Sequence, residues 1–167
     1  MNTPLDPDIG ISLPVTWRRR TAPAHGVVVS ARSGRLPASG VHPELTLRCA
    51  VVDSGLGEWR AEAIGELSRR LVDFDVEDED VFDLLGREVA YHRFAHRLGA
   101  ADVLSDQWAW LADRLGVTLT CSVAREDYPD YCDVFEAIAE TVTIKRAVAR
   151  EARARYVGEC RSSERRA

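Results

Sequence analysis

Features of membrane and secreted proteins are missing from this sequence. No apolar stretch is long enough to cross a bilayer, and the N-terminus, MNTPLDPDIG, has neither a basic start nor an apolar run behind it. We therefore expect no membrane insertion and a cytoplasmic location. Cysteine is scarce and scattered at Cys49, Cys121, Cys132 and Cys160, with no CxxC pair and no zinc-type spacing. These thiols are expected to be reduced, mostly buried and free of metal.

The short motifs of common catalytic chemistry are missing as well. There is no GxxxxGK[ST] loop, and the chain has a single lysine, Lys145. The only GxG, at residues 55–57, has Arg60 where a dinucleotide fingerprint needs its third glycine. GxSxG, HExxH and EF-hand patterns do not occur. We expect a protein that is not an enzyme and binds no cofactor.

What the sequence does contain suits one domain with a single core. Its 167 residues are 46% hydrophobic and 29% charged, with a net charge of -5. Residues 145–167 hold eight basic and three acidic groups, so residues 1–144 carry a net charge of -10. We predict one domain over residues 1–144 and a basic tail over residues 145–167 that is helical or disordered.

Short apolar stretches between turn residues predict strands in both halves of the chain. The expected strands are Ile9–Trp17, Val27–Ala31, Leu45–Val52, Leu84–His96, Asp106–Leu111 and Gly116–Val123. Apolar spacing predicts a helix over Leu56–Asp73, and Pro129, with Asp127 as a cap, begins a second. The acidic residues between 73 and 83 are placed in a loop. The predicted fold class is α+β, a mainly antiparallel sheet of about six strands covered by two amphipathic helices.

Two of these strands alternate between apolar and polar residues. The apolar row is expected to face the helices and contains Leu45, Leu47, Cys49, Val51, Val117, Leu119, Cys121 and Val123. The opposite row, with Arg48, Thr118, Thr120 and Ser122, then faces away from them. This row must be covered or solvated, which makes it a candidate binding surface.

A pair of tryptophans is the second binding candidate. Trp108 and Trp110 lie on one side of their strand because a single residue, Ala109, separates them. Beside threonine and arginine side chains, the two indoles predict a platform for a peptide or an amphipathic helix. The alternative is that both lie in the core under a helix.

His92 and His96 form an HxxxH pattern, which on a helix would place two imidazoles on one face for a metal. On a strand, a separation of about 13 Å is too large for one ion. We favour the strand and predict no metal site, with a metal shared with Asp102 or Asp106 as the alternative. The acidic run at 73–83 lacks the oxygen spacing of a calcium loop.

The charged segments limit the choice of partners. The basic tail lacks interleaved aromatic residues, and the acidic body repels phosphate, so we expect no nucleic acid partner. Attraction between the tail and the acidic run, within one chain or in a homodimer, is an open alternative.

The order of elements resembles the PsbP-like superfamily, nearest to its DcrB-like and LpqN-type members. Three stretches carry the resemblance: the opening IGISLPVTW at Ile9–Trp17, the strand at Val117–Val123 and the closing VFEAIAETV at Val134–Val142. The resemblance spans residues 9–142 and implies a fold whose members are generally not enzymes. Many LpqN-type and DcrB-type proteins carry a lipoprotein signal; none is seen here, which implies a cytosolic branch.

Three functions stay open from the sequence. The leading hypothesis is a non-catalytic protein-binding module, a chaperone or adaptor for a secreted effector, with Arg48, His92, Trp108, Trp110, Thr118 and Thr120 contacting the partner. The second is a small-ligand or lipid-binding protein in which Arg48 or His92 holds an anionic group between helix and sheet. The third is an enzyme that uses His92 or His96 as a general base.

Overall fold

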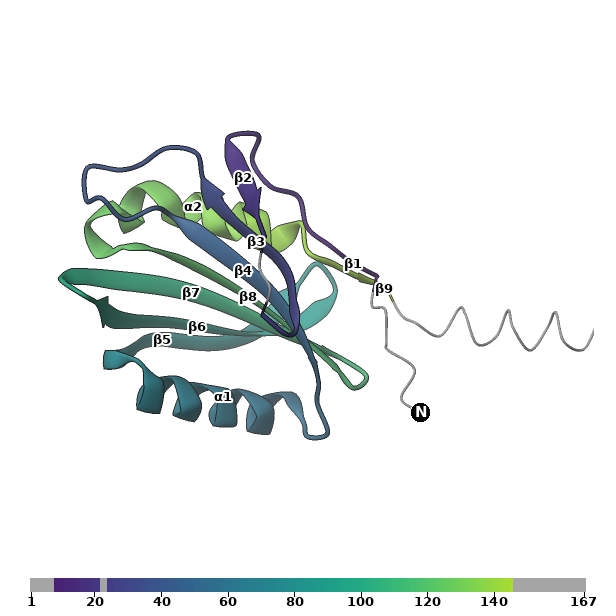
Figure 1. Cartoon of the computed structure of the whole chain (residues 1–167). Helices are drawn as coiled ribbons and strands as arrows, with labels where there is room; N and C mark the ends of the chain where they lie inside the picture. The colour runs from purple at the N-terminus through teal and green to yellow at the C-terminus, as the bar shows by residue number, and fades with distance from the viewer. Residues whose placement is uncertain (1–7, 22–23, 146–167) are drawn as a thin grey trace, which may run out of the picture.

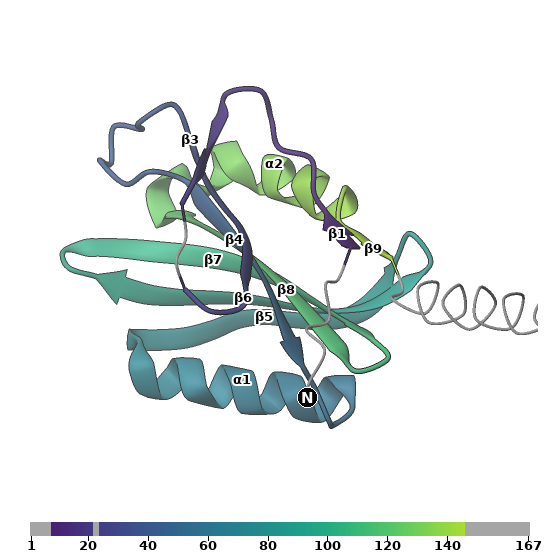
Figure 2. The same ribbon diagram turned by 45° about the vertical axis from the view of Figure 1, so that its right-hand side comes forward.

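The computed structural model describes residues 8–21 and 24–145 of the chain. An antiparallel sheet has one helix against each face (Figures 1 and 2). In spatial order its seven strands are β2 (Trp17–Arg20), β3 (Val27–Ser33), β4 (Glu44–Val51), β8 (Leu115–Ala124), β7 (Ala101–Ala112), β6 (Arg87–Leu98) and β5 (Val72–Leu84). The other elements are β1 (Asp8–Gly10) paired with β9 (Thr143–Lys145), α1 (Leu56–Arg70), α2 (Tyr128–Glu140) and a short 3₁₀ turn, η1 (Arg125–Asp127). The predicted α+β class is confirmed.

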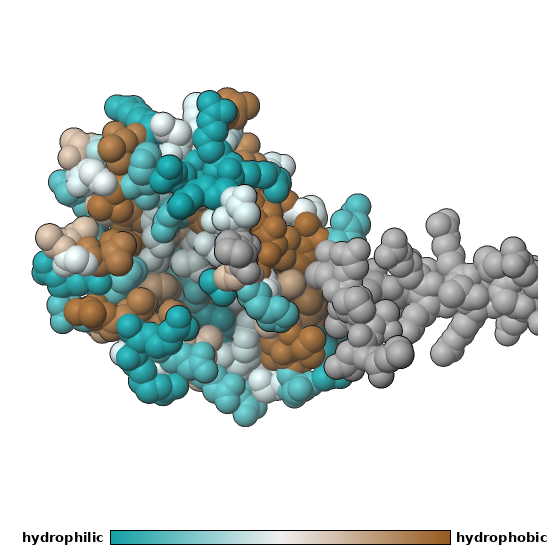
Figure 3. All heavy atoms as spheres, in the orientation of Figure 1, coloured by the Kyte–Doolittle hydropathy of each residue, from teal (hydrophilic) through white to brown (hydrophobic). Residues whose placement is uncertain are grey.

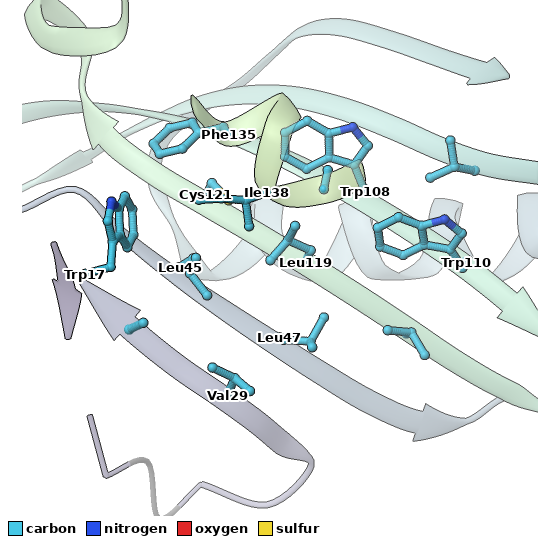
Figure 4. Close-up of a cluster of buried hydrophobic side chains, with 14 of the residues drawn as sticks. Trp17, Val29, Leu45, Leu47, Trp108, Trp110, Leu119, Cys121, Phe135 and Ile138 are labelled. Carbon is cyan, nitrogen blue, oxygen red and sulfur yellow. The ribbon is translucent and has the colours of Figure 1, made fainter. Parts of the chain in front are cut away.

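The hydrophobic core lies between the sheet and α2 (Figure 4). Leu45 and Leu47 of β4 lie opposite Cys121 and Leu119 of β8, and all four side chains are buried. Phe135 of α2 packs into the same cluster and is fully buried. The apolar row predicted from the alternation therefore forms the core, with the exceptions that Cys49 is half-buried and Val51 is exposed.

The second helix, α1, covers the opposite face of the sheet over β5, β6 and β7. Its contacts there include Trp59, whose ring lies against Gly116 of β8, and Arg60, which donates to Gln107 of β7. The two helices therefore lie on opposite faces of the sheet, so the prediction that both cover the apolar row and leave the other face free is wrong. Among the described residues, α1 leaves its side of the sheet open over β2, β3, β4 and part of β8.

The acidic segment at 73–83 is part of strand β5 and not a loop, so that prediction is wrong. Phe74, Val76, Phe82 and Leu84 are half-buried between exposed acidic residues, which is an alternation that a strand can use. The pairing with β6 shifts register twice, between Val72 and Asp75 and between Val76 and Asp78. Because of these two register shifts and the many acidic residues, the alternation of β5 is not regular enough to predict a strand from the sequence.

The first predicted strand, Ile9–Trp17, is also divided. Its ends belong to β1 and β2, and between them the backbone turns, with the Trp17 N–H donating to the Pro14 carbonyl. With β5, β1 and β9 added, the described part of the chain has more strands than the six expected. Both predicted helices are confirmed, and Lys145, assigned above to the tail, is the last residue of β9. The rest of the predicted tail, 146–167, lies outside the described residues.

Candidate functional site

The part of the sheet that α1 leaves open presents three cross-strand rows of polar side chains. In an antiparallel sheet, residues paired in register point to the same face. We call this surface the polar face; its residues are Arg18, Arg20, Ser30, Arg32, Glu44, Thr46, Arg48, Thr118, Thr120 and Ser122. The hydroxyl-bearing members are half-buried, whereas Arg18, Arg20, Arg48 and Glu44 are exposed.

One row of the polar face continues beneath α1. Thr120 pairs in register with Gln107, and Gln107 pairs with His92. The Gln107 amide donates to the Thr120 hydroxyl at 2.9 Å, and its carbonyl oxygen accepts from the guanidinium of Arg60 on α1. A hydrogen-bonded chain thus joins the open face to a group between helix and sheet.

Arg60 is the most buried residue of α1, with 4% of its surface exposed. Its side chain also lies over the Trp59 ring, 5.0 Å from the ring centroid. Its Nε has no hydrogen-bond partner, and among residues 8–21 and 24–145 no carboxylate lies within ion-pair distance of it. Burial lowers the pKa of Arg60 to about 10, so the group is still charged at neutral pH.

His92 occupies the same row, one strand further under α1. Its Nε2 lies 3.7 Å from a carboxylate oxygen of Glu79 on β5, and its buried Nδ1 has no hydrogen-bond partner. Burial and the nearby charge of Arg60 lower the pKa of His92, with Glu79 acting in the opposite direction. The imidazole is therefore neutral at pH 7 and does not add to the positive charge of the polar face.

A separate buried polar network lies on the core face, where α2 begins. The carboxylate of Asp106 on β7 accepts from Tyr91 Oη at 2.6 Å, from Tyr128 Oη at 2.9 Å and from Arg93 Nε at 3.3 Å. The Arg93 guanidinium also stacks over the Tyr128 ring. Burial and the hydrogen bond to Asp106 raise the pKa of Tyr91. The network holds the first turn of α2 to the sheet, and its tyrosines remain protonated donors.

Comparison with known proteins finds similarity at the level of the fold. No protein-family model and no curated protein matches the sequence. The structure of LpqN of Mycobacterium tuberculosis, a protein involved in cell envelope biogenesis, superposes with a TM-score of 0.68 at 16% identity, covering 86% of this chain and 87% of that one. Cyanobacterial PsbP from Synechocystis superposes with a TM-score of 0.60 at 13% identity, covering 82% and 86%. The chain has a PsbP-like fold.

A third structure with this fold, a protein of unknown function from Pseudomonas aeruginosa, has a TM-score of 0.60 at 10% identity and covers 85% and 86% of the two chains. The resemblance predicted from the sequence is confirmed as a shared fold. The matched share is similar in both directions, so the PsbP-like fold accounts for most of this chain.

Within the PsbP-like fold, the predicted tryptophan platform is wrong. Trp108 and Trp110 pair in register with Leu119 and Val117 and lie on the core face (Figure 4). Their exposed fractions are only 3% and 4%. The physical reason is the register of β7 on β8. Trp108 and Trp110 lie opposite residues of the apolar row of β8, so their side chains point to the same face as that row, toward the core. The alternative, that both lie in the core, is correct.

The other predicted site residues separate into two groups. Arg48, Thr118 and Thr120 lie on the polar face, and His92 lies on the same face of the sheet but under α1. His92 and His96 are confirmed on one strand, β6. In the described part of the chain, no cluster of metal-ligating side chains occurs and no helix is both long and apolar enough to cross a bilayer.

The structure also gives several residues a place that was not predicted from the sequence. Arg60 was used only to reject a nucleotide motif, and Gln107 was not considered. Asp106 lies on the same side of its strand as Trp108 and Trp110. Its position among these apolar residues could have been used to predict a buried carboxylate. Arg18, Arg20 and Arg32 were not predicted to lie at the site, because the strands predicted at Ile9–Trp17 and Val27–Ala31 end before these residues.

Two cavities lie at opposite ends of the sheet, away from the polar face. One, of about 490 Å³, is lined by Ser39, Val41, Ala100, Ala101, Asp102, Ala124, Arg125 and Glu126. The other, of about 610 Å³, lies between Leu56, the turn at Leu85 and the end of β7. Neither is lined by Arg48 or His92, the two residues expected to hold an anionic ligand.

Proposed function

We propose that this chain is a non-catalytic protein-binding module that receives its partner on the polar face. The observation that carries the proposal is the part of the α1 side of the sheet that α1 leaves open among the described residues, where Thr46, Thr118 and Thr120 are half-buried. Rows of hydroxyl and guanidinium groups on a rigid sheet provide hydrogen bonds in fixed register.

We further propose that the module acts in the cytoplasm, as a chaperone or adaptor for a secreted effector. Cys49, Cys121 and Cys132 are free thiols, which suits a reducing compartment. Burial raises the pKa of Cys121 and of Cys49, which makes them poor nucleophiles and supports a non-catalytic role.

The test is an affinity pull-down that compares which polypeptides are retained by the full-length chain and by two variants of it. Thr46→Tyr/Thr118→Tyr places two rings on the polar face, on strand positions that tolerate aromatic residues. Glu62→Tyr/Glu66→Tyr adds the same rings to the exposed side of α1. We expect a polypeptide that the wild type and the α1 variant retain and the polar-face variant loses. Equal retention by all three folded proteins would refute the proposed surface.

A further inference from the structure

The polar face carries an excess of positive charge. Its basic members are Arg18, Arg20, Arg32 and Arg48, and its acidic member is Glu44. Glu44 is engaged by Arg20 at 3.6 Å. Figure 3 shows hydrophilic side chains gathered over the part of the molecule where Figure 1 places β2 and β3.

This charge distribution costs the fold stability. Arg18 and Arg32 are directly opposite each other on β2 and β3, and like charges in that position destabilise a strand pair. The chain as a whole is acidic, with a net charge of -5, so the basic face does not follow from overall composition. A local excess of arginine that the described acidic residues do not neutralise is typical of a surface that meets an anionic partner.

Arg60, which lies between α1 and the same side of the sheet, adds a second positive charge beside the polar face. Among residues 8–21 and 24–145 no carboxylate lies within ion-pair distance of this buried group, and the side chain to which it donates, Gln107, is a neutral amide that in turn donates to Thr120 on the polar face. A buried guanidinium raises the electrostatic potential around it, because the surrounding protein screens charge less than water does. The partner would supply the missing negative charge.

The chemistry of the surface favours carboxylates of a polypeptide over a nucleic acid. None of its ten residues is aromatic, so it offers no ring on which a base could stack. It spans β2, β3, β4 and β8, roughly 15 Å at about 4.8 Å per strand spacing, which matches a short peptide segment. Beyond α1, acidic residues of β5 would repel a long polyanion.

We propose that the polar face recognises an acidic segment of the partner protein, with Arg18, Arg32 and Arg48 binding Asp or Glu side chains. The hydroxyl groups of Thr46, Thr118 and Thr120 donate hydrogen bonds to the same segment. This inference rests on the proposed function and adds the chemistry of the partner. Guanidinium groups bind carboxylates in a bidentate manner, and such bonds are stronger than neutral ones.

The experiment measures binding of a fluorescent peptide of alternating Glu and Ser to the full-length chain by anisotropy. The test variant is Arg18→Gln/Arg48→Gln, which removes two exposed charges from the polar face. The matched control is Arg69→Gln/Arg70→Gln, which removes two exposed charges from the end of α1. We expect the dissociation constant to rise roughly tenfold in the test variant, since each exposed ion pair contributes up to about 1 kcal/mol, and less than about twofold in the control.

The inference would be overturned by no binding of the peptide, by an equal loss in both variants, or by an oligothymidylate of equal charge binding as tightly as the peptide. Self-association of the wild type without peptide, seen by sedimentation and lost in the test variant, would instead assign the face to a second copy of the chain. If the tyrosine variant loses its captured polypeptide while Arg18→Gln/Arg48→Gln retains it, the proposed function stands and the acidic partner is refuted.

Discussion

At the scale of single residues, Asp106 has the largest predicted effect on stability. Its buried carboxylate accepts from two tyrosines and from Arg93. Asp106→Asn keeps the size of the side chain but leaves Arg93 without its counter-ion and presents an N–H₂ to hydroxyl donors. We expect the free energy of unfolding to fall by about 3 kcal/mol, measured by urea denaturation.

The matched control for that measurement is Asp102→Asn on the same strand. Asp102 is exposed and forms a surface ion pair with Arg97 at 3.6 Å, so its replacement should change the free energy of unfolding by less than about 1 kcal/mol. Equal effects of the two substitutions would mean that the Asp106 network is not a stabilising element.

The histidines under α1 predict a pH dependence of stability. Burial lowers the pKa of both His92 and His96, and for His92 the charge of Arg60 lowers it further. The unfolded chain therefore binds protons before the native state does, and stability falls as pH drops through the ordinary histidine value of about 6.5. We expect a lower free energy of unfolding at about pH 5.5 than at about pH 7.5.

The variant His92→Gln/His96→Gln should lose part of this dependence between the two pH values. His25→Gln is the control, because the side chain of His25 is exposed. A double variant whose stability falls with pH as steeply as that of the wild type would assign the effect to other groups.

At the scale of elements, the position of α1 depends on a close approach to β8. A Cβ added to Gly116 would lie 2.6 Å from Val52 Cγ2 and 2.7 Å from Trp59 Cη2. Gly116→Ala should therefore shift the N-terminal half of α1 and lower the free energy of unfolding by about 2 kcal/mol. Gly57→Ala, in α1 with open space around its Cβ position, makes the same chemical change and should be neutral or slightly stabilising.

Elements with a regular pattern could be predicted from the sequence, and those at edges and contacts between layers could not. The alternation in β4 and β8 and the apolar spacing of α2 identified the core, because burial on one side imposes a period. Strand β5 was missed because an edge strand tolerates charge at most positions. Arg60 was missed because its burial depends on Gln107, which is distant in sequence.

At the scale of the whole molecule, the sheet ends in two strands of opposite charge. The short strand β2 carries Arg18, Arg19 and Arg20, whereas β5 carries acidic residues along thirteen positions. A long unpaired edge invites pairing with another chain, and charge is a common protection against it. Charge repulsion thus opposes pairing of β5 with β5, or of β2 with β2, between two copies of the chain.

Removing charge from β5 should therefore promote self-association. We expect Asp78→Asn/Asp80→Asn to sediment faster than the wild type at the same concentration, because both positions lie in the middle of the exposed edge. Glu62→Gln/Glu66→Gln removes the same charge from α1, where the backbone hydrogen bonds are satisfied within the helix, and should leave the sedimentation coefficient unchanged. Faster sedimentation of both variants would attribute association to net charge alone, whereas an effect confined to β5 identifies the unpaired backbone of that strand as the group that the carboxylates protect.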